Sequence, residues 1–152
     1  MKGRVWGIAG FCCRLAAGGV FVYAAVVKLL APAEEFAFAI ETYKVLPAAL
    51  TLAPAHVLPW VELVAGAFLA AGFCTRYAAL AVGGMLVFFE LLMAQAMLRG
   101  LEVTNCGCFG SGANIPIGVE FALNLLTLAC CWCAWKHGDR LLAADGVIRR
   151  DH

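Results

Sequence analysis

Four long apolar runs constrain what this chain can fold into more than any other feature. They cover about residues 5–30, 55–73, 77–98 and 117–135. A helix needs roughly 20 apolar residues to cross the hydrocarbon core of a bilayer, and each run is close to that length. Because lipid offers no hydrogen-bond partner to free backbone groups, each run should be helical. The sequence therefore predicts an all-α integral membrane protein, a four-transmembrane-helix bundle that forms a single domain over residues 1–152.

The composition supports a membrane protein and argues against a soluble one. Hydrophobic residues make up 64% of the chain and charged residues only 14%, whereas a soluble domain is about 45–50% apolar and about 25% charged. The net charge of +1 gives no reason to expect a nucleic-acid partner. The run at the N-terminus is too long for the apolar region of a cleaved secretory signal. The lipid bilayer is therefore the first partner that we expect.

Lysine and arginine residues indicate how the helices are oriented. Cytoplasmic loops carry an excess of these residues, and the predicted topology places most of them on one side: Lys2, Arg4, Arg76, Lys136, Arg140, Arg149 and Arg150. We therefore expect both termini in the cytoplasm, with residues 136–152 forming a cytoplasmic tail. The loops before the second and fourth helices would then lie outside the cytoplasm.

The first of these outer loops, residues 31–54, contains a helical pattern of its own. Phe36, Ile40 and Tyr43 recur at helical spacing behind two acidic residues. This pattern predicts a short amphipathic helix in the first extracytoplasmic loop, lying on the outer surface of the membrane.

The second outer loop carries two cysteines separated by a single glycine, Cys106-Gly107-Cys108. Glycine tolerates the backbone angles that a small disulfide ring requires, and a strained, exposed disulfide exchanges readily. This favours a redox-active pair that would act as the catalytic residues of a thiol-disulfide oxidoreductase. Two other interpretations stay open: a permanent disulfide that staples the loop, and part of a metal site that would need ligands from elsewhere.

The chain also resembles a known family along most of its length. The residues that carry the likeness are Arg14, Gly18, Lys28, Leu29, Phe36, Ile40, Tyr43, Pro47, Pro59, Trp60, Glu62, Gly66, Gly72, Arg99-Gly100, the Cys106-Gly107-Cys108-Phe109-Gly110 segment and Asn124. With these residues the sequence is similar to the MauE branch of the DoxX-like membrane proteins. The loop motif is the most specific part of the match.

The resemblance carries expectations about fold, location and partners. It implies a four-helix bundle in a bacterial inner membrane, with the cysteine loop facing the periplasm. Proteins of this kind support the maturation of disulfide-containing periplasmic proteins and often accompany a thioredoxin-like periplasmic partner. Other DoxX-like members are linked to quinone-coupled sulfur oxidation, so the resemblance makes a quinone the candidate cofactor.

Six further cysteines lie in the apolar runs or at their ends: Cys12, Cys13, Cys74, Cys130, Cys131 and Cys133. Each can simply pack as a small apolar residue. The adjacent pairs Cys12–Cys13 and Cys130–Cys131 also allow a soft-metal site for Cu(I) or Hg(II), as in a small metal transporter. This transporter is the alternative to the redox protein, and a non-catalytic membrane scaffold is the third hypothesis.

Several ionisable residues interrupt the apolar runs, where lipid makes them costly, so they should face the bundle interior. We expect Arg14 to pair with Glu90 or Glu62, and Lys28 to pair with Glu62 or Glu120. One interpretation is that buried ion pairs set the register of the helices.

The other interpretation is a polar pocket beneath the cysteine loop that binds a quinone head group or carries protons. Arg14 and Glu62 would supply its polar groups, and Trp60 and Phe109 would supply flat rings. Trp60 suits the membrane–water interface equally well.

Overall fold

The computed structural model describes residues 2–101 and 116–138 of the chain, and every regular element in that part is helical. The helices are α1 (Lys2–Leu30), α2 (Ala33–Thr42), α3 (Leu52–Ala71), α4 (Thr75–Leu98) and α5 (Ile117–His137), with a short 3₁₀ turn η1 (Ala48–Leu50) before α3. Four of them, α1, α3, α4 and α5, are long and apolar enough to cross a membrane. The predicted all-α bundle of four spanning helices is therefore confirmed.

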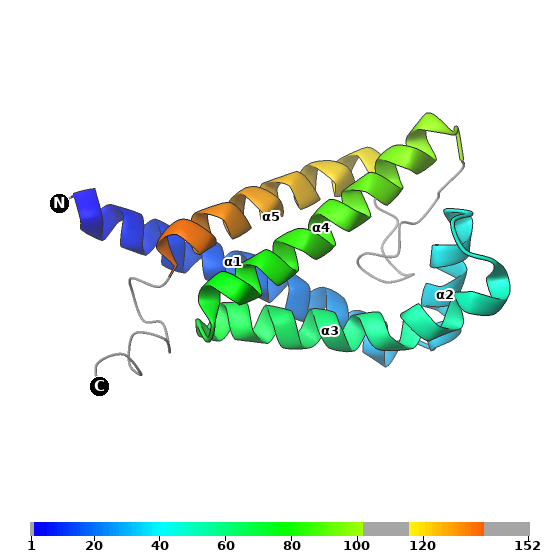
Figure 1. The fold of residues 1–152 in the computed structure, drawn as a ribbon, viewed down its shortest axis with the longest axis horizontal. Helices are drawn as coiled ribbons and strands as arrows, with labels where there is room; N and C mark the ends of the chain where they lie inside the picture. The colour runs from blue at the N-terminus through cyan, green and yellow to red at the C-terminus, as the bar shows by residue number, and fades with distance from the viewer. Residues whose placement is uncertain (1, 102–115, 139–152) are drawn as a thin grey trace.

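The four long helices alternate in direction, so the bundle has two distinct ends (Figure 1). At one end α1 and α4 finish while α3 and α5 begin, and α2 lies beside them; we call this the loop end. At the other end a short turn joins α3 to α4 and α5 finishes; we call this the turn end. Helix α1 packs on α3 and α5, and α4 packs on α5 and α3.

The crossing of α1 and α3 is held close by small residues. A Cβ atom built on Gly18 would lie 2.7 Å from the backbone nitrogen of Ala70 and 2.7 Å from the carbonyl oxygen of Gly66. Small residues permit such backbone approach in lipid, where dispersion contacts rather than the hydrophobic effect hold helices together. Gly84 on α4 makes no such contact, because a Cβ atom built on it would meet nothing within 4 Å.

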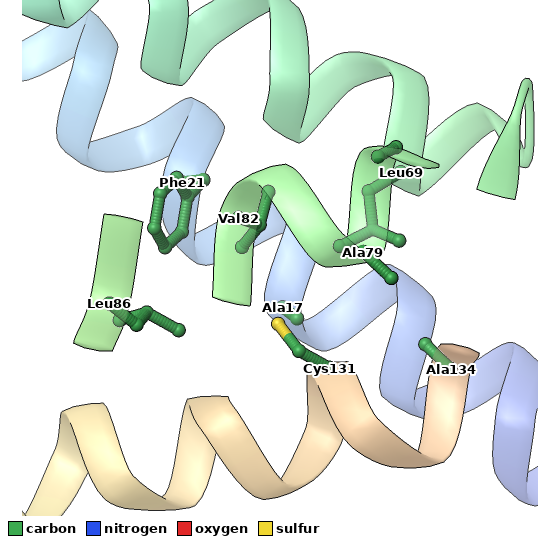
Figure 2. Close-up of a cluster of buried hydrophobic side chains, with 9 residues drawn as sticks. Ala17, Phe21, Leu69, Ala79, Val82, Leu86, Cys131 and Ala134 are labelled. Carbon is green, nitrogen blue, oxygen red and sulfur yellow. The ribbon is translucent and has the colours of Figure 1, made fainter. Parts of the chain in front are cut away.

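The middle of the bundle is filled by apolar side chains from all four spanning helices. Figure 2 shows them converging: Ala17 and Phe21 from α1, Leu69 from α3, Ala79, Val82 and Leu86 from α4, and Cys131 and Ala134 from α5. Many large apolar side chains point outward instead, as expected of helices whose surroundings are lipid. This core separates the polar groups of the loop end from those of the turn end.

The predicted helix in the first loop is present as α2, and it does more than rest on a surface. Its buried residues Phe36, Ala37 and Ala39 pack against Ala55 in the first turns of α3. The following residue Tyr43 is also buried and belongs to a separate cluster with Met93 of α4. Helix α2 therefore covers part of the loop end of the bundle.

Candidate functional site

A buried ion pair lies toward the loop end between α1 and α3. Both carboxylate oxygens of Glu62 accept hydrogen bonds from the Lys28 Nζ at 2.7 Å. The two side chains are only 2% and 3% exposed. A charged pair this deeply buried in an apolar bundle must be well matched, because neither ion alone is tolerated there. The sequence left two partners open for Lys28, and the structure confirms Glu62.

Two aromatic rings enclose the ammonium group of this pair. The Nζ of Lys28 lies 4.8 Å from the ring centre of Phe36 on α2 and 5.7 Å from that of Phe89 on α4. Both distances lie in the range of cation–π attraction. Helix α2 thus closes over the ion pair with an aromatic ring.

Three more polar side chains from the neighbouring helices are buried near the ion pair. Glu90 is 8% exposed, Glu120 is 1% exposed and Asn124 is 5% exposed. The negative charge of Glu120 acts on Lys28, and the amide of Asn124 lies beside the Glu90 carboxyl group. We call Lys28, Glu62, Glu90, Glu120 and Asn124 the polar cluster. It contains three carboxyl groups for one amine.

Tyr43 borders the polar cluster from the segment that follows α2. Its side chain is buried, and its hydroxyl lies near the carboxyl group of Glu120. Burial, and then the negative charge of Glu120, raise the pKa of Tyr43 well above its usual value. Tyr43 is therefore a neutral hydrogen-bonding group at any physiological pH.

A small cavity lies beside the ion pair, at the edge of the polar cluster. Its volume is about 20 Å³, and Lys28, Glu62 and Asn124 contribute the polar part of its lining. A polar cavity needs about 10–15 Å³ to hold a water molecule, so this one has room for about one. It is far too small for a quinone ring. The site is built to hold charges and a water molecule in a dry surrounding.

The ends of the cysteine-bearing segment are anchored close to the polar cluster. Leu101, which precedes the segment, and Ile117, which follows it, both pack on the cluster of Tyr43, Met93 and Ala96. Met93 Sδ in turn accepts a hydrogen bond from Asn124 Nδ2 at 3.7 Å. The predicted site residues Cys106, Cys108 and Phe109 themselves lie outside the described residues.

The predicted pairing of Arg14 is wrong. Its Nη1 donates a hydrogen bond of 3.0 Å to the carbonyl oxygen of Gly138, just after α5. Arg14 lies almost four helical turns from Lys28, about 21 Å along α1. Neither oxygen of Glu90 receives a hydrogen bond from it, and Lys28 occupies both oxygens of Glu62. Arg14 instead stabilises the carbonyl end of a helix, where a cation is favoured.

The predicted pocket of Trp60, Glu62, Arg14 and Phe109 is not assembled by the described residues. Trp60 is 59% exposed on the outside of α3, whereas Glu62 is 2% exposed and faces the interior. Two residues apart on a helix, these side chains point in very different directions. Arg14 lies at the turn end, as shown above. Only Glu62 of the described members belongs to the polar cluster.

The cysteines near the turn end form a different set from the one expected. The thiol of Cys13 on α1 is within hydrogen-bonding reach of Cys133 and Cys130 on α5. Cys131 is 3% exposed and packs in the core, and Cys12 is exposed. The metal set of Cys12, Cys13, Cys130 and Cys131 is therefore not brought together. Within residues 2–101 and 116–138 no group of three or more cysteine, histidine or acidic side chains is arranged to hold a metal ion.

Sequence reasoning overlooked two contributions to these sites. It did not place Phe36 and Phe89 around Lys28, although the spacing of Phe36 did identify the buried side of α2. It did not select Cys133, although Cys130 and Cys133 are three apart and so share a face of a helix. Helical spacing, and not adjacency in the sequence, indicates which of these cysteines share a face of α5.

Comparison with known proteins gives a consistent result. Residues 6–136 match the family described as methylamine utilisation protein MauE. The MauE protein of Paracoccus denitrificans is 34% identical over 109 residues, which cover 72% of this chain and 58% of that protein. The MauE protein of Methylophilus methylotrophus is 30% identical over 107 residues, covering 70% of this chain and 56% of that protein.

A third relative, the MauE protein of Methylorubrum extorquens, is 30% identical over 125 residues, covering 74% of this chain and 67% of that protein. The chain thus spans little more than half the length of the first two relatives. No solved structure matches it.

Proposed function

Because the chain belongs to the methylamine utilisation protein MauE family, we propose that it is a membrane thiol-disulfide redox protein. Its Cys106-Gly107-Cys108 segment exchanges disulfides with a thioredoxin-like protein outside the cytoplasm. This exchange supports the maturation of a disulfide-containing periplasmic protein, which is consistent with a role in methylamine utilisation.

The observation that carries this proposal is the joint anchoring of the cysteine-bearing segment over the polar cluster. Leu101 and Ile117 pack on the same cluster of Tyr43, Met93 and Ala96, so the described residues on either side of the segment lie close to one cluster. That cluster adjoins Asn124, which lines the small cavity and binds Met93. The described residues at both ends of the segment thus lie near buried groups that can hold and release protons.

The exchange itself needs only sulfur chemistry. A thiolate of one protein attacks a sulfur of the disulfide in the other, and a mixed disulfide forms as the second thiolate leaves. Attack by the remaining cysteine of the first protein releases the product, so one disulfide is made for each disulfide broken. The exchange conserves electrons and runs in either direction.

Regeneration of the pair as a disulfide releases two protons and two electrons. A membrane quinone is the proposed acceptor, and it becomes a hydroquinone by taking up both. The polar cluster contributes by accepting and passing protons, since ionisable groups inside a membrane are typical of proton pathways. Because the cavity holds about one water molecule, the quinone would approach from the lipid and not enter the bundle.

The proposed orientation places the loop end in the periplasm of a bacterial inner membrane. Lysine and arginine support it: Arg76 begins α4 at the turn end, and Lys136 finishes α5 there. The acidic residues Glu34 and Glu35 open α2 at the loop end. A thioredoxin-like partner would then meet the cysteine-bearing segment without entering the membrane.

A mixed-disulfide trap tests the proposal. The purified chain, oxidised and held in lipid nanodiscs, is mixed with a reduced thioredoxin-fold protein whose second active-site cysteine is replaced by serine. We expect a covalent complex that a reductant cleaves. Peptide mapping should locate the mixed disulfide at Cys106 or Cys108. The variant Cys106→Ser/Cys108→Ser should form none.

The variant Cys74→Ser provides the matched control, because Cys74 is exposed but lies in the turn at the opposite end. It should trap the probe as well as the parent chain does. Equal trapping by the double variant, or unchanged maturation of the periplasmic client in cells that carry it, would rule the proposal out. A disulfide that no thioredoxin-fold probe can reduce would instead indicate a scaffold with a permanent staple.

A further inference from the structure

Three thiols from two helices meet toward the turn end, far from the cysteine-bearing loop. Cys13 on α1 is in hydrogen-bonding reach of both Cys133 and Cys130 on α5, and all three are partly exposed. We call Cys13, Cys130 and Cys133 the thiol triad. The fourth nearby cysteine, Cys131, turns into the core instead.

The packing of α1 on α5 independently supports this meeting. A Cβ atom built on Gly10 would lie 2.6 Å from the carbonyl carbon of His137, and Arg14 binds the carbonyl of Gly138. The two helices therefore run antiparallel with their backbones nearly touching at this level. One turn further along, that register sets Cys13 against the stretch that carries Cys130 and Cys133. Such backbone approach is what a disulfide between two helices requires, because its Cα atoms are only about 4.4–6.8 Å apart.

Among the described residues, the surroundings of these thiols open toward lipid. They belong to the spanning segments of α1 and α5, and Cys13 lies about 12 Å along α1 from the start of its span at Val5. The neighbouring side chains Leu15 and Trp132 are exposed and apolar. A soluble redox protein cannot bring a sulfur atom to that depth, so the reaction partner must itself be small and soluble in lipid.

We infer that the thiol triad is a second redox site, which exchanges two electrons with a lipid-soluble quinone and links α1 to α5 by a disulfide. The S–H bonds of Cys13 and of Cys133 or Cys130 break, and one S–S bond forms. The two protons and two electrons reduce the quinone to a hydroquinone. The third thiol is placed to exchange with the new disulfide, since Cys130 and Cys133 share one face of α5.

This site is separate from the proposed function. Ile117 and Cys130 are thirteen residues apart on α5, about 20 Å along the helix, while exchange requires contact between sulfur atoms. Ile117, where α5 begins after the cysteine-bearing segment, is therefore well removed from the triad. Its experiment uses the Cys106→Ser/Cys108→Ser variant as the starting protein, so the outcome does not depend on the outer pair.

The starting protein is reduced, placed in phosphatidylcholine–phosphatidylglycerol nanodiscs and exposed to decylubiquinone or to oxidised glutathione, which does not enter lipid. We expect decylubiquinone to be consumed at one equivalent per chain, with a disulfide joining the Cys13 peptide to the α5 peptide in non-reducing peptide mapping. Oxidised glutathione should leave these thiols open to later alkylation.

Cys13→Ser should abolish both the quinone consumption and the cross-link, and Cys13→Ala should do the same if serine disturbs folding. Cys12→Ser is the matched control, because Cys12 is the exposed neighbour of Cys13 in α1, and it should behave like the starting protein. Complete alkylation of the triad after quinone treatment, or full quinone consumption by Cys13→Ser, would overturn the inference. Oxidation by glutathione as fast as by quinone would overturn the lipid route.

Discussion

The two ends of the bundle differ in the side chains that they bury. The loop end buries the Lys28–Glu62 ion pair together with two further carboxyl groups, and it contains a cavity the size of about one water molecule. The turn end is packed backbone to backbone, with Gly10 against His137 and with one buried arginine bound to a carbonyl oxygen. Both ends contain buried charge, and among the described residues it is at the loop end that two charged side chains, Lys28 and Glu62, line a cavity.

The comparison of the two ends distinguishes a charged group with a structural role from charged groups that can take part in a reaction. Arg14 has a structural task, because its hydrogen bond to the carbonyl oxygen of Gly138 satisfies the carbonyl end of α5. The polar cluster exceeds any such task, because one ion pair would have been enough to join α1 to α3. A surplus of carboxyl groups in a dry place is costly, so we interpret the loop end as the part that works with the cysteine-bearing segment.

The largest effect that we expect comes from breaking the ion pair at the loop end. Lys28→Met leaves the Glu62 carboxylate buried without its counter-charge, which should lower the free energy of unfolding by about 3–5 kcal/mol. Denaturant unfolding in detergent micelles measures it. The double variant Lys28→Met/Glu62→Met should recover most of the loss, because neither member of the ion pair is left buried without its counter-charge. A double variant as unstable as the single one would show that the pair itself stabilises the bundle.

A smaller effect is expected from overfilling the contact at the turn end. Gly10→Ala places a methyl group against the backbone of His137, and such overpacking should cost about 1–3 kcal/mol of unfolding free energy. Gly19→Ala is the matched control, because nothing lies within 4 Å of the added atom; it should gain about 0.5–1 kcal/mol. If both variants behave alike in the same unfolding assay, α1 and α5 do not pack as described.

The smallest effect is expected from the aromatic cover of Lys28. Phe36→Leu keeps an apolar side chain on α2 but removes the ring 4.8 Å from the ammonium, which should cost about 0.5–2 kcal/mol. Phe38→Leu, at a side chain that is 69% exposed, should change little. In a Lys28→Met background the cost of Phe36→Leu should shrink, because the cation is gone. An undiminished cost would mean that the ring acts by packing alone.

How far the sequence predicts this molecule depends on the kind of question. The number of spanning helices followed from run length, and the presence of a short helix in the first loop followed from the spacing of Phe36, Ile40 and Tyr43. Its packing on α3 did not follow from the sequence. The pairing of Lys28 was narrowed to two carboxyl groups because both lie at a similar depth. The predicted partner of Arg14 was wrong because Arg14 binds a backbone carbonyl group. Every residue has such a group, so the sequence does not indicate which one is bound.

For the cysteines, too, the sequence predicted position but not pairing. It showed that six of them lie in the apolar runs or at their ends. The predicted pairs were adjacent residues, and adjacent residues on a helix point in different directions. The structure selects Cys13 with Cys130 and Cys133 because the rotation of α1 and α5 turns those thiols toward each other. The same rotation sends Cys131 into the core.

By itself, the sequence determined that this chain spans a membrane four times and carries charges that must face inward, because lipid imposes length and polarity on every segment. Only the tertiary structure decided which charges and which thiols meet. The physical reason is that helices in lipid are apolar on nearly all faces, so no hydrophobic stripe marks the side that packs. Facing and register are set by close contacts such as Gly18 on Ala70 and Gly10 on His137, which join residues far apart in the chain.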